Sequence, residues 1–454
     1  MNKLFGHRIK IFTWGRLRGV LALALTLTLF SCDDFLDITP TGKVIPSTLD
    51  EYRALLGYEY NNFVTDRYMT TIRTDEVRLG ATTSSEDLDA YRDLWLWKDE
   101  DPQPSTTYFS WRTYYHSIYI ANYIIEHKGE MTNGSSDDVS QLIGEAYMMR
   151  AYCHFLLVNL FAEPYTHCTP ASTRGIPLML AADVNAMPRS SSVETVYQQV
   201  LSDLDEAGKY MKVEKWDKGY NYRFNVASVD ALRARTYLYM GDWQNAYDAA
   251  QDVITAWGDL EDMTATSSKL PTNAESVDNI VALEHFSTNM STVISLVQTA
   301  FVNKYRTGDY RKTKYFKTSG STTTLLKSDG YSSFRSAEAY LTAAEALAQQ
   351  GSTAEAIAQL MPLLAKRLNS TALQNAQNLM VGMTQDELLE EIYDERAREL
   401  AFEGHRWYDL RRTTQPQLTR TYGGATYTLT PEKYTMKFPT EAVEANPEIV
   451  IWEP

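Results

Sequence analysis

Cysteine is scarce in this sequence, and its scarcity excludes a fold built on disulfides. The 454 residues include three cysteines. Cys32 follows an N-terminal apolar segment, which leaves Cys153 and Cys168 for the rest of the chain. Two cysteines cannot supply the framework on which small secreted domains depend. Cys153 lies in a helical pattern and Cys168 in the loop after it, so a disulfide between them is sterically allowed, but two free thiols are the simpler prediction.

Positive charge is also in short supply. Lys and Arg number 43 against 58 Asp and Glu, which gives a formal net charge of −15. Because affinity for phosphate backbones depends mainly on Lys and Arg, this balance argues against nucleic acid as a partner.

Common catalytic motifs are missing as well. The sequence contains no His-Glu-x-x-His, Cys-x-x-Cys, phosphate-binding loop or Gly-x-Ser-x-Gly. With 58 acids in the chain, sequence pairs of carboxylates say almost nothing about glycoside hydrolysis. We therefore expect no enzyme activity and no cofactor, and the sequence assigns no metal site. A helical glycan-cleaving enzyme is the weaker alternative.

The N-terminus carries an apolar run that is too short to span a membrane. Residues 20–30 are uncharged and largely apolar, and these 11 residues fall short of the roughly 20 that a spanning helix needs. Five bases and no acid precede the run, and Leu29-Phe30-Ser31-Cys32 ends it. This ending resembles the lipobox of bacterial lipoproteins, so we predict a signal peptide over residues 1–31 and a lipidated Cys32. An ordinary signal peptide with an incidental cysteine is the alternative.

The predicted mature chain is more acidic than the whole sequence. Without the leader, 38 bases remain against 58 acids, a net charge of −20. Asp33, Asp34 and Asp37 follow Cys32 and resemble the export signal of surface-exposed lipoproteins. We therefore predict a lipid-anchored outer-membrane protein that faces outwards.

Hydrophobic periodicity predicts a mostly α-helical fold. Apolar residues recur at spacings of three and four over residues 143–161, and Ser191 with Glu194 and Thr384 with Glu387 resemble capping boxes for two further helices. Long polar connections cover residues 163–191, 258–276 and 308–333.

Two helix pairs resemble tetratricopeptide repeats. In residues 229–254 and 337–364, Gly241 and Gly351 interrupt runs that carry small residues where antiparallel helices approach closely. The match is partial, because Arg233 stands where the repeat usually has Leu. We expect an all-α single domain over residues 32–454, with helix pairs in about 143–254 and 335–410, long irregular loops and small β-hairpins.

The most specific sequence is the charged run over residues 392–412. Asp394 and Arg398 have the i, i+4 spacing of a helical ion pair, and Arg396, Glu399 and Glu403 lie in line with apolar Ile392. Charges that continue an apolar stripe should be paired and partly buried. Gly404 is expected to end the helix and turn Arg406 back toward Glu399 or Glu403.

This run resembles the signature of the SusD/RagB family of outer-membrane nutrient-binding lipoproteins. Further segments resemble the family along the chain: Thr74-Asp75-Glu76-Val77, residues 111–122, Gly308-Asp309-Tyr310-Arg311, residues 334–346, and Phe438-Pro439 with Asn446-Pro447. The structural signature residues on this reading are Arg335, Glu338, Glu395, Arg396, Glu399, Glu403 and Arg406.

The resemblance implies a fold and a function. Family members have an α-helical domain with tetratricopeptide-like pairs, sit as a lid on a SusC-like TonB-dependent transporter, and capture glycans or, in some branches, peptides without acting as enzymes. We expect this chain to deliver a glycan, or alternatively a peptide, to such a transporter. A helical-repeat adaptor that grips a protein partner is a further alternative.

Aromatic residues are the candidates for ligand contact, because Trp and Tyr rings stack on the apolar faces of sugars. Trp95 and Trp97 alternate beside a charged loop, and Tyr305 and Tyr310 lie in a segment with six bases and one acid over residues 304–317. Packing of the two tryptophans in the core is an equal alternative. For the basic segment, a solvated hairpin is favoured over a site for acidic sugars or an acidic transporter surface.

Overall fold

The computed structural model describes residues 45–64, 66–79, 85–100, 102–286, 297–327, 330–331 and 333–452. Contacts divide the chain into Met1–Pro46 and Ser47–Pro454, and the second unit is described below. The predicted leader and Cys32 lie outside the described residues.

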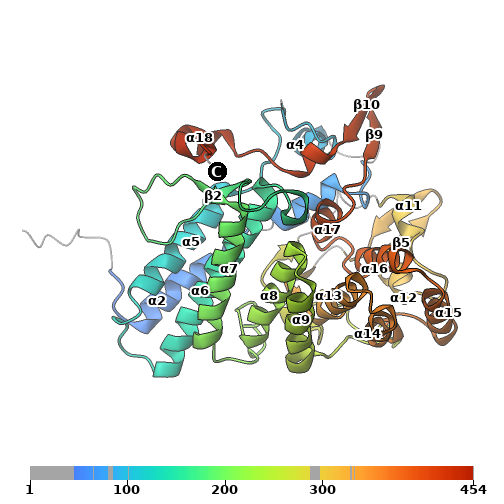
Figure 1. The fold of residues 1–454 in the computed structure, drawn as a ribbon, viewed down its shortest axis with the longest axis horizontal. Helices are drawn as coiled ribbons and strands as arrows, with labels where there is room; N and C mark the ends of the chain where they lie inside the picture. Colours follow the sequence, from blue (N-terminus) through green and yellow to red (C-terminus); the bar gives the residue numbers. More distant parts are fainter. Residues whose placement is uncertain are drawn as a thin grey trace, which may run out of the picture. The chain divides into compact units, whose positions relative to one another are not determined.

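The first half of the unit contains a layer of long helices (Figure 1). The central helix α6 (Ser136–Phe161) is buried continuously from Gln141 to Phe161, as expected for a helix that is apolar on most sides. It packs against helices on either side. The remaining helices of this half are α2 (Leu49–Asn61), α3 (Asp66–Met69), η2 (Thr70–Arg73), α4 (Ser85–Trp95), α5 (Trp111–Glu126), η3 (Tyr165–His167) and α7 (Val193–Tyr210).

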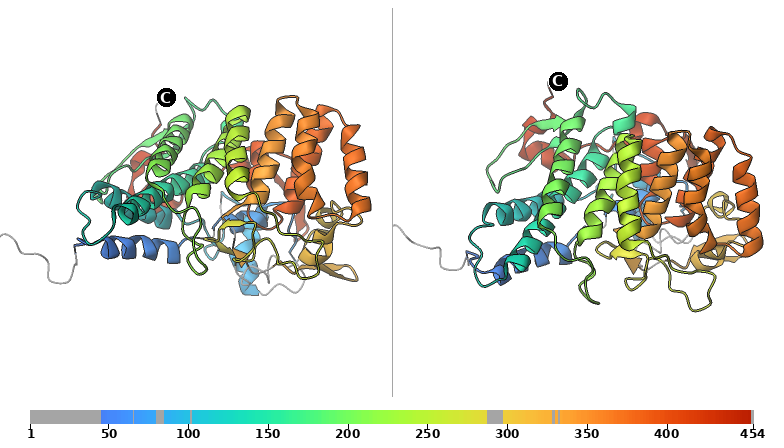
Figure 2. Two further views of the ribbon diagram at one scale, coloured as in Figure 1. Left: turned by 90° about the horizontal axis from the view of Figure 1, so that it is seen from below. Right: turned by 60° about the horizontal axis from the view of Figure 1, so that its bottom comes forward.

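The predicted helix pairs form two helical hairpins. The first joins α8 (Val226–Met240) to α9 (Trp243–Trp257), and the second joins α13 (Ser336–Gln349) to α14 (Thr353–Ala365). Gly241 and Gly351 have φ values of 75° and 82°, the left-handed conformation that glycine adopts without steric cost. Figure 2 shows α8, α9, α13, α14 and α15 (Ser370–Val381) side by side.

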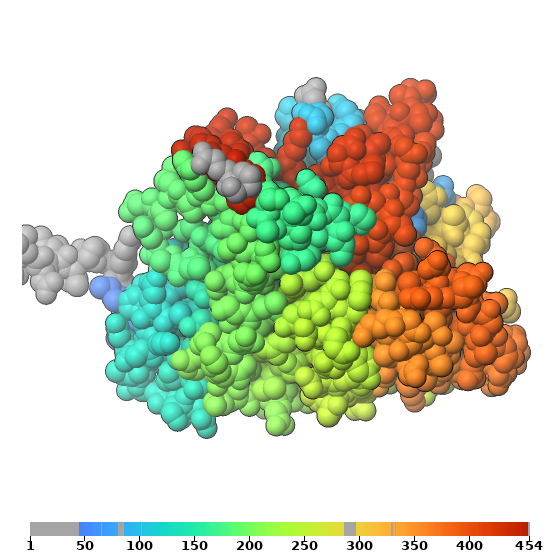
Figure 3. All heavy atoms as spheres, viewed as in Figure 1, coloured from blue at the N-terminus to red at the C-terminus, as the bar shows by residue number. Residues whose placement is uncertain are grey.

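The C-terminal segments return across the N-terminal ones. Helices α16 (Gln385–Glu399) and α17 (Arg406–Arg412) lead to the hairpin β9 (Leu418–Tyr422) and β10 (Ala425–Leu429). Figure 3 shows this red segment beside the blue one that contains α4, and Arg420 of β9 donates a hydrogen bond to the carbonyl of Trp95. Helices η5 (Pro431–Tyr434), α18 (Thr440–Ala445) and η6 (Pro447–Val450) end the described chain.

Strands are short and pair only in twos within the described ranges. The pairs are β1 (Arg174–Pro177) with β2 (Ser190–Ser192), β3 (Asn279–Val281) with β8 (Phe334–Arg335), β4 (His285–Phe286) with β7 (Gly330–Tyr331), and β5 (Phe316–Ser319) with β6 (Thr322–Leu325). Short helices α11 (Thr299–Val302) and α12 (Tyr310–Tyr315) lie between β4 and β5. The predicted all-α class with helix pairs, long loops and small hairpins is confirmed.

Two details of the predicted helices change. The cap of α7 is Ser192, which accepts from the Thr195 N–H, so the predicted Ser191 is off by one residue. The capping box of Thr384 with Glu387 forms as predicted. Across the described ranges, the structure has no helix long and apolar enough to cross a membrane.

Candidate functional site

The charged signature forms the buried centre of the fold. A continuous set of ion pairs, here called the buried ion network, joins six bases to six acids. The bases are Arg306, Arg311, Lys327, Arg335, Arg367 and Arg398, and the acids are Asp278, Asp309, Glu391, Glu395, Glu399 and Glu403. The network is therefore neutral as a whole, which is the condition under which buried charges are tolerated.

Glu399, at the end of α16, is the hub of the network. Arg367 donates to both of its carboxylate oxygens at 2.9 Å, Arg335 donates at 3.2 Å and Arg311 at 3.0 Å. Burial opposes ionisation of Glu399, but these three guanidinium groups outweigh it and hold the pKa of the carboxyl far below its usual range. Arg311 and Arg398 lower the pKa of Glu395 to about 2 in the same way.

Two smaller clusters account for other signature residues. Arg396 binds Asp409 at 3.1 Å, and Arg412 binds the two oxygens of Glu345 at 2.5 and 2.8 Å. Glu338 pairs with Arg235 of α8 at 2.6 and 2.7 Å. The charged stripe predicted to be paired and buried, Arg396, Glu399 and Glu403, is paired and buried in the structure. The other signature residues Arg335, Glu338 and Glu395 are buried as well.

Two predicted contacts and one predicted helix end around the signature are wrong. Arg406 binds Asp75 through two hydrogen bonds of 2.8 Å instead of Glu399 or Glu403. Helix α16 already ends at Glu399, so Gly404 lies in the following turn, where it directs Arg406 toward the N-terminal segment. Asp394 pairs with Lys304, while Arg398 bonds to Glu391 and Glu395.

Half of the bases in the segment over residues 304–317 form ion pairs with acids of α16. Lys304, Arg306 and Arg311 pair with Asp394, Glu391 and Glu395 respectively. Arg311 is fully buried. A free basic patch does not describe this segment, because half of its bases are bound to acids of the signature helix. The predicted solvated hairpin is present only at the end of the segment, where β5 carries the exposed Lys317.

The four predicted ligand-contact aromatics are mostly interior. Trp95 and Trp97 are 7% and 1% exposed, and their ring N–H groups donate to the carbonyls of Val77 and Arg73. The Arg420 guanidinium lies 4.7 and 4.2 Å from the two ring centroids. In this conformation the rings offer no free face to a sugar, which favours the packing alternative.

The tyrosines of the basic segment lie close to the ion network. Tyr305 is 3% exposed and donates to the carbonyl of Arg398 at 2.7 Å, so it also has a packing role. Tyr310 is half-buried at the start of α12. A ligand contact by these two rings stays a prediction.

A different set of aromatic rings reaches solvent around residues 272–279. Tyr220 is 54% exposed, Tyr331 is 37% exposed, and Trp216 and Trp257 are half-buried. The indole N–H of Trp257 donates to the Val277 carbonyl at 2.9 Å, and the Tyr331 backbone N–H donates to the Thr272 carbonyl at 2.8 Å. We call this set (Trp216, Tyr220, Trp257, Tyr331) the aromatic surface.

Hydrogen bonds and cations hold the tryptophans of the aromatic surface in place. The Trp216 N–H donates to the Phe224 carbonyl at 2.9 Å, and Arg223 lies 3.8 Å from the Trp216 ring centroid. Lys215 lies 4.8 Å from the ring centroid of Trp257. Trp216 and Tyr220 lie in the loop between α7 and α8, Trp257 ends α9, and Tyr331 lies in β7. The rings are thus preorganised and partly exposed, as a stacking platform requires.

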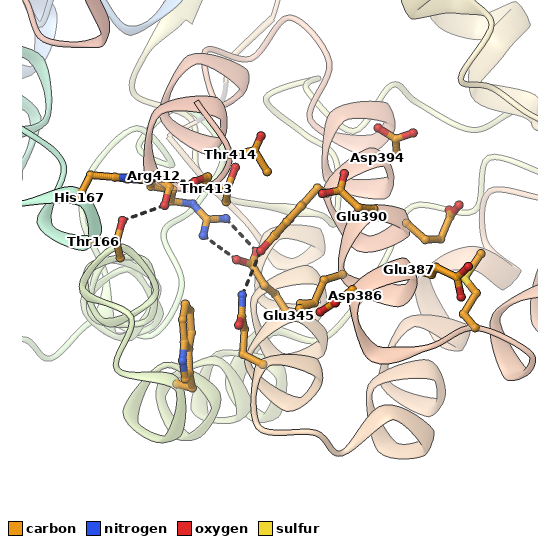
Figure 4. A pocket seen from close by; sticks show the side chains of 16 residues that line it. Thr166, His167, Glu345, Asp386, Glu387, Glu390, Asp394, Arg412, Thr413 and Thr414 are labelled. Atoms are coloured by element: carbon orange, nitrogen blue, oxygen red, sulfur yellow. Dashed lines mark hydrogen bonds and ion pairs between the residues drawn. The ribbon is translucent and has the colours of Figure 1, made fainter. Parts of the chain in front are cut away.

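A cavity lies at the opposite end of α9, where the N-terminal Trp243 contributes to its lining. Its volume is about 780 Å³, within the range of about 300–1,000 Å³ found for ligand pockets. Figure 4 shows the acids Asp386, Glu390 and Asp394 along α16 and the Arg412–Glu345 pair within the lining. We call it the acidic pocket. It is lined by Thr166, His167, Trp243, Glu345, Gln349, Met383, Asp386, Glu387, Leu389, Glu390, Glu391, Tyr393, Asp394, Arg412, Thr413 and Thr414.

Other sequence predictions have simple outcomes. Cys153 is a buried free thiol and Cys168 a half-buried one, so the prediction of free thiols is confirmed. Across the part of the chain that the structure describes, no group of three His, Cys, Asp or Glu side chains has the arrangement of a metal site.

Sequence reasoning missed several important residues. Asp278 and Arg367 complete the buried ion network, yet each stands in a connection without a local pattern. Trp216 and Trp257 were detectable as tryptophans near loop segments, but nothing nearby in the sequence separates them from packed rings.

Family comparisons cover nearly all of the chain after the predicted leader. Residues 34–238 match a family described as "Starch-binding associating with outer membrane", and residues 203–448 match the "SusD family". Two similar proteins come from Formosa agariphila. SusD-like protein P38 is 25% identical over 69% of this chain and 74% of its own length, and SusD-like protein P2 is 22% identical over 86% and 89%.

Solved structures share the fold. A SusD superfamily protein from Bacteroides thetaiotaomicron matches with a TM-score of 0.72 at 22% identity, over 90% of this chain and 100% of its own. A putative sugar-binding protein from Bacteroides vulgatus gives 0.73 at 19% identity, over 91% and 99%. A laminarin-binding SusD-like protein gives 0.64 at 19% identity, over 90% and 100%.

Proposed function

The chain belongs to the SusD family, and on that premise we propose that it is a cell-surface lipoprotein that binds an oligosaccharide and delivers it to a TonB-dependent transporter. The family is glycan-binding and associated with the outer membrane. The lipobox-like sequence before Cys32 and the acidic residues after it support a lipid anchor and an outward orientation.

The aromatic surface is the observation that favours a glycan as the ligand. Sugar rings present apolar C–H faces to aromatic rings, and their hydroxyl groups need polar neighbours. Trp216 and Trp257 supply half-buried rings. The Lys218–Glu275 pair, with an N–O distance of 2.5 Å, joins the loop of Trp216 to the loop whose Val277 carbonyl accepts from Trp257. We assign glycan contact to this surface in place of Trp95 and Trp97.

Calorimetric titration with a panel of neutral oligosaccharides, laminarin fragments included, tests the glycan site. We expect Trp216→Ala with Trp257→Ala to weaken binding at least about tenfold, or about 1.4 kcal/mol. Trp452→Ala is the matched control, because Trp452 is also half-buried and its N–H donates to a backbone carbonyl, that of Ser172 at 3.0 Å.

The same titration separates the alternatives. Equal loss of affinity in the Trp452 variant would refute a role specific to the aromatic surface. Binding of oligopeptides with no binding of any oligosaccharide would replace the glycan by a peptide. We expect bound oligosaccharides to be recovered uncleaved, and cleavage by the pure protein would contradict a binding role without catalysis.

Anchoring and the transporter partner need experiments in cells. Cys32→Ala should abolish labelling with a radioactive fatty acid and release the protein from the membrane, because the acyl chains are what bury apolar surface in the bilayer. Protease treatment of intact cells should remove the wild-type chain, and full protection would refute surface exposure. Extraction in mild detergent should recover a TonB-dependent transporter with it, and repeated recovery of the lipoprotein alone would contradict a stable partnership.

A further inference from the structure

The acidic pocket is a second site, separate from the aromatic surface. Trp243 and Trp257 stand at the two ends of α9, and 14 residues of helix at 1.5 Å each place them roughly 20 Å apart. The pocket therefore needs its own ligand assignment, and its charges allow one.

Most charged groups of the pocket are already paired. Arg412 occupies both oxygens of Glu345, and Lys304 binds Asp394. Arg306 and Arg398 share an oxygen of Glu391. The only arginine of the lining is thus neutralised, and so are three of its acids.

Three acids in the pocket, Asp386, Glu387 and Glu390, lack such partners within the described ranges, and Glu387 is instead bonded to Thr384 in the capping box of α16. Asp386 and Glu390 are exposed, and no base of the described ranges lies within ion-pair distance of either. They stand at i and i+4 on α16, so their like charges repel each other. A cation bound between them would remove that repulsion.

Several hydrogen-bond donors of the pocket are already bonded within the protein. The Thr166 hydroxyl donates to the Arg412 carbonyl, and His167 bonds to the Thr413 carbonyl, both at 2.8 Å. The Gln349 amide donates to the Tyr393 hydroxyl at 3.0 Å. These donors are committed within the protein, whereas the carboxylates of Asp386 and Glu390 are acceptors available to a ligand.

An aromatic ring completes the site. Trp243 is half-buried, and the edge of its ring lies close to Gly241, near 3.4 Å from where a Cβ would stand there. A sugar ring can stack on such a ring, and a protonated amine is attracted to its face.

We propose that the acidic pocket binds protonated amino-sugar units of an oligosaccharide, with Asp386 and Glu390 holding the ammonium groups and Trp243 stacking on a ring. The inference rests on the proposed function in that the ligand is a glycan. A sugar suits the cavity better than a single Lys or Arg side chain, because a volume of about 780 Å³ has room for more than one extended side chain.

The test compares two probes that differ in charge at the same sugar. A β-1,4-linked glucosamine hexamer and its fully N-acetylated counterpart are titrated into the protein at about pH 6, where Asp and Glu are ionised. We expect the glucosamine hexamer to bind at least tenfold more tightly, and the preference to shrink as salt is added.

Variants locate the effect. Asp386→Asn with Glu390→Gln should reduce affinity for the glucosamine hexamer at least tenfold and leave the acetylated probe unaffected. Glu441→Gln with Glu444→Gln is the matched control, since both acids are exposed on α18 and removing them changes net charge equally. An equal loss of affinity for the glucosamine hexamer in the two double variants would mean that the acidic protein attracts the hexamer through its overall charge, and would overturn the proposed site.

Two further outcomes are decisive. Equal affinity for both hexamers would overturn amine recognition, yet leave the proposed function intact if neutral glycans still depend on Trp216 and Trp257. A tri-lysine peptide that binds as tightly as the hexamer, with the same loss in the Asp386/Glu390 variant, would overturn the sugar assignment in favour of basic peptides.

Discussion

Replacing Glu399 with Gln tests whether the buried ion network supports the fold. The substitution keeps the size of the side chain and removes one negative charge from a neutral set of six bases and six acids. Four hydrogen bonds of 2.9–3.2 Å reach this carboxylate from Arg311, Arg335 and Arg367. A Gln amide can accept at its oxygen, but its NH₂ group would face arginine N–H donors.

The expected cost is large because the orphaned charge is buried. Removing one partner of a buried pair typically costs about 3–5 kcal/mol, so we expect Glu399→Gln to lower the free energy of unfolding by at least about 3 kcal/mol at neutral pH. Urea unfolding followed by tryptophan fluorescence measures it. Glu390→Gln, an exposed change on the same helix, should stay within about 0.5 kcal/mol of the wild type.

The dependence on pH gives an independent check. The folded pKa of Glu399 lies below its usual value of 4.5, so its stabilising contribution is present above about pH 4.5 and is lost as the pH falls below that value. The stability difference between wild type and Glu399→Gln should therefore narrow on acidification. A variant within about 1 kcal/mol of the wild type at neutral pH, or a difference that does not change with pH, would refute the reasoning.

Three further predictions follow from particular sites. Gly404→Ala should lower the free energy of unfolding in urea by more than about 2 kcal/mol, because φ at Gly404 is 74° and the Arg67 carbonyl oxygen lies 2.4 Å from where a Cβ would stand. Gly219→Ala is the control: φ there is 91° but the space is open, so the cost should be about 1 kcal/mol. Equal costs for the two variants would contradict this reasoning. Burial raises the pKa of Glu76 to about 8, so ionisation of this carboxyl opposes folding. Glu76→Gln should therefore gain stability relative to the wild type as the pH rises from about 4.5 to 8. Parallel curves of unfolding free energy against pH for the two proteins would contradict this. Trp97→Ala should lower the free energy of unfolding by about 3–5 kcal/mol because the ring is buried, and unchanged stability would restore the case for a ligand role.

Local rules of sequence explain which parts of the fold could be predicted. The capping box at Thr384 and the glycine turns at Gly241 and Gly351 depend on residues within four positions of each other, so the sequence contains all of their determinants. The cap of α7 moved from Ser191 to Ser192 because adjacent serines offer the same chemistry, and only the register of the following helix decides between them.

Pairing partners at long range could not be predicted from one sequence. The stripe of charges on α16 indicates that partners exist, but Asp278 and Arg367 are separated from Glu399 by 121 and 32 residues. The same limit applies to Trp95 and Trp97, whose alternating pattern beside charged residues is equally typical of a loop and of a strand edge. They are buried because Arg420, more than 300 residues away in sequence, covers both rings.

Burial of Lys and Arg side chains in the ion network affects which glycans the protein surface can bind. Lys and Arg number 38 in the predicted mature chain against 58 acids, and the buried ion network removes six of each from the balance. The net charge of −20 is unchanged, but the ratio of acids to bases among the remaining charged groups is higher. The segment richest in bases also forms ion pairs with α16. Such a surface repels polyanions over about a Debye length, roughly 10 Å at 0.1 M salt. A uronate-rich or sulfated oligosaccharide is therefore the poorest match to this protein, and added salt should bring its affinity closer to that of a neutral oligosaccharide of the same length.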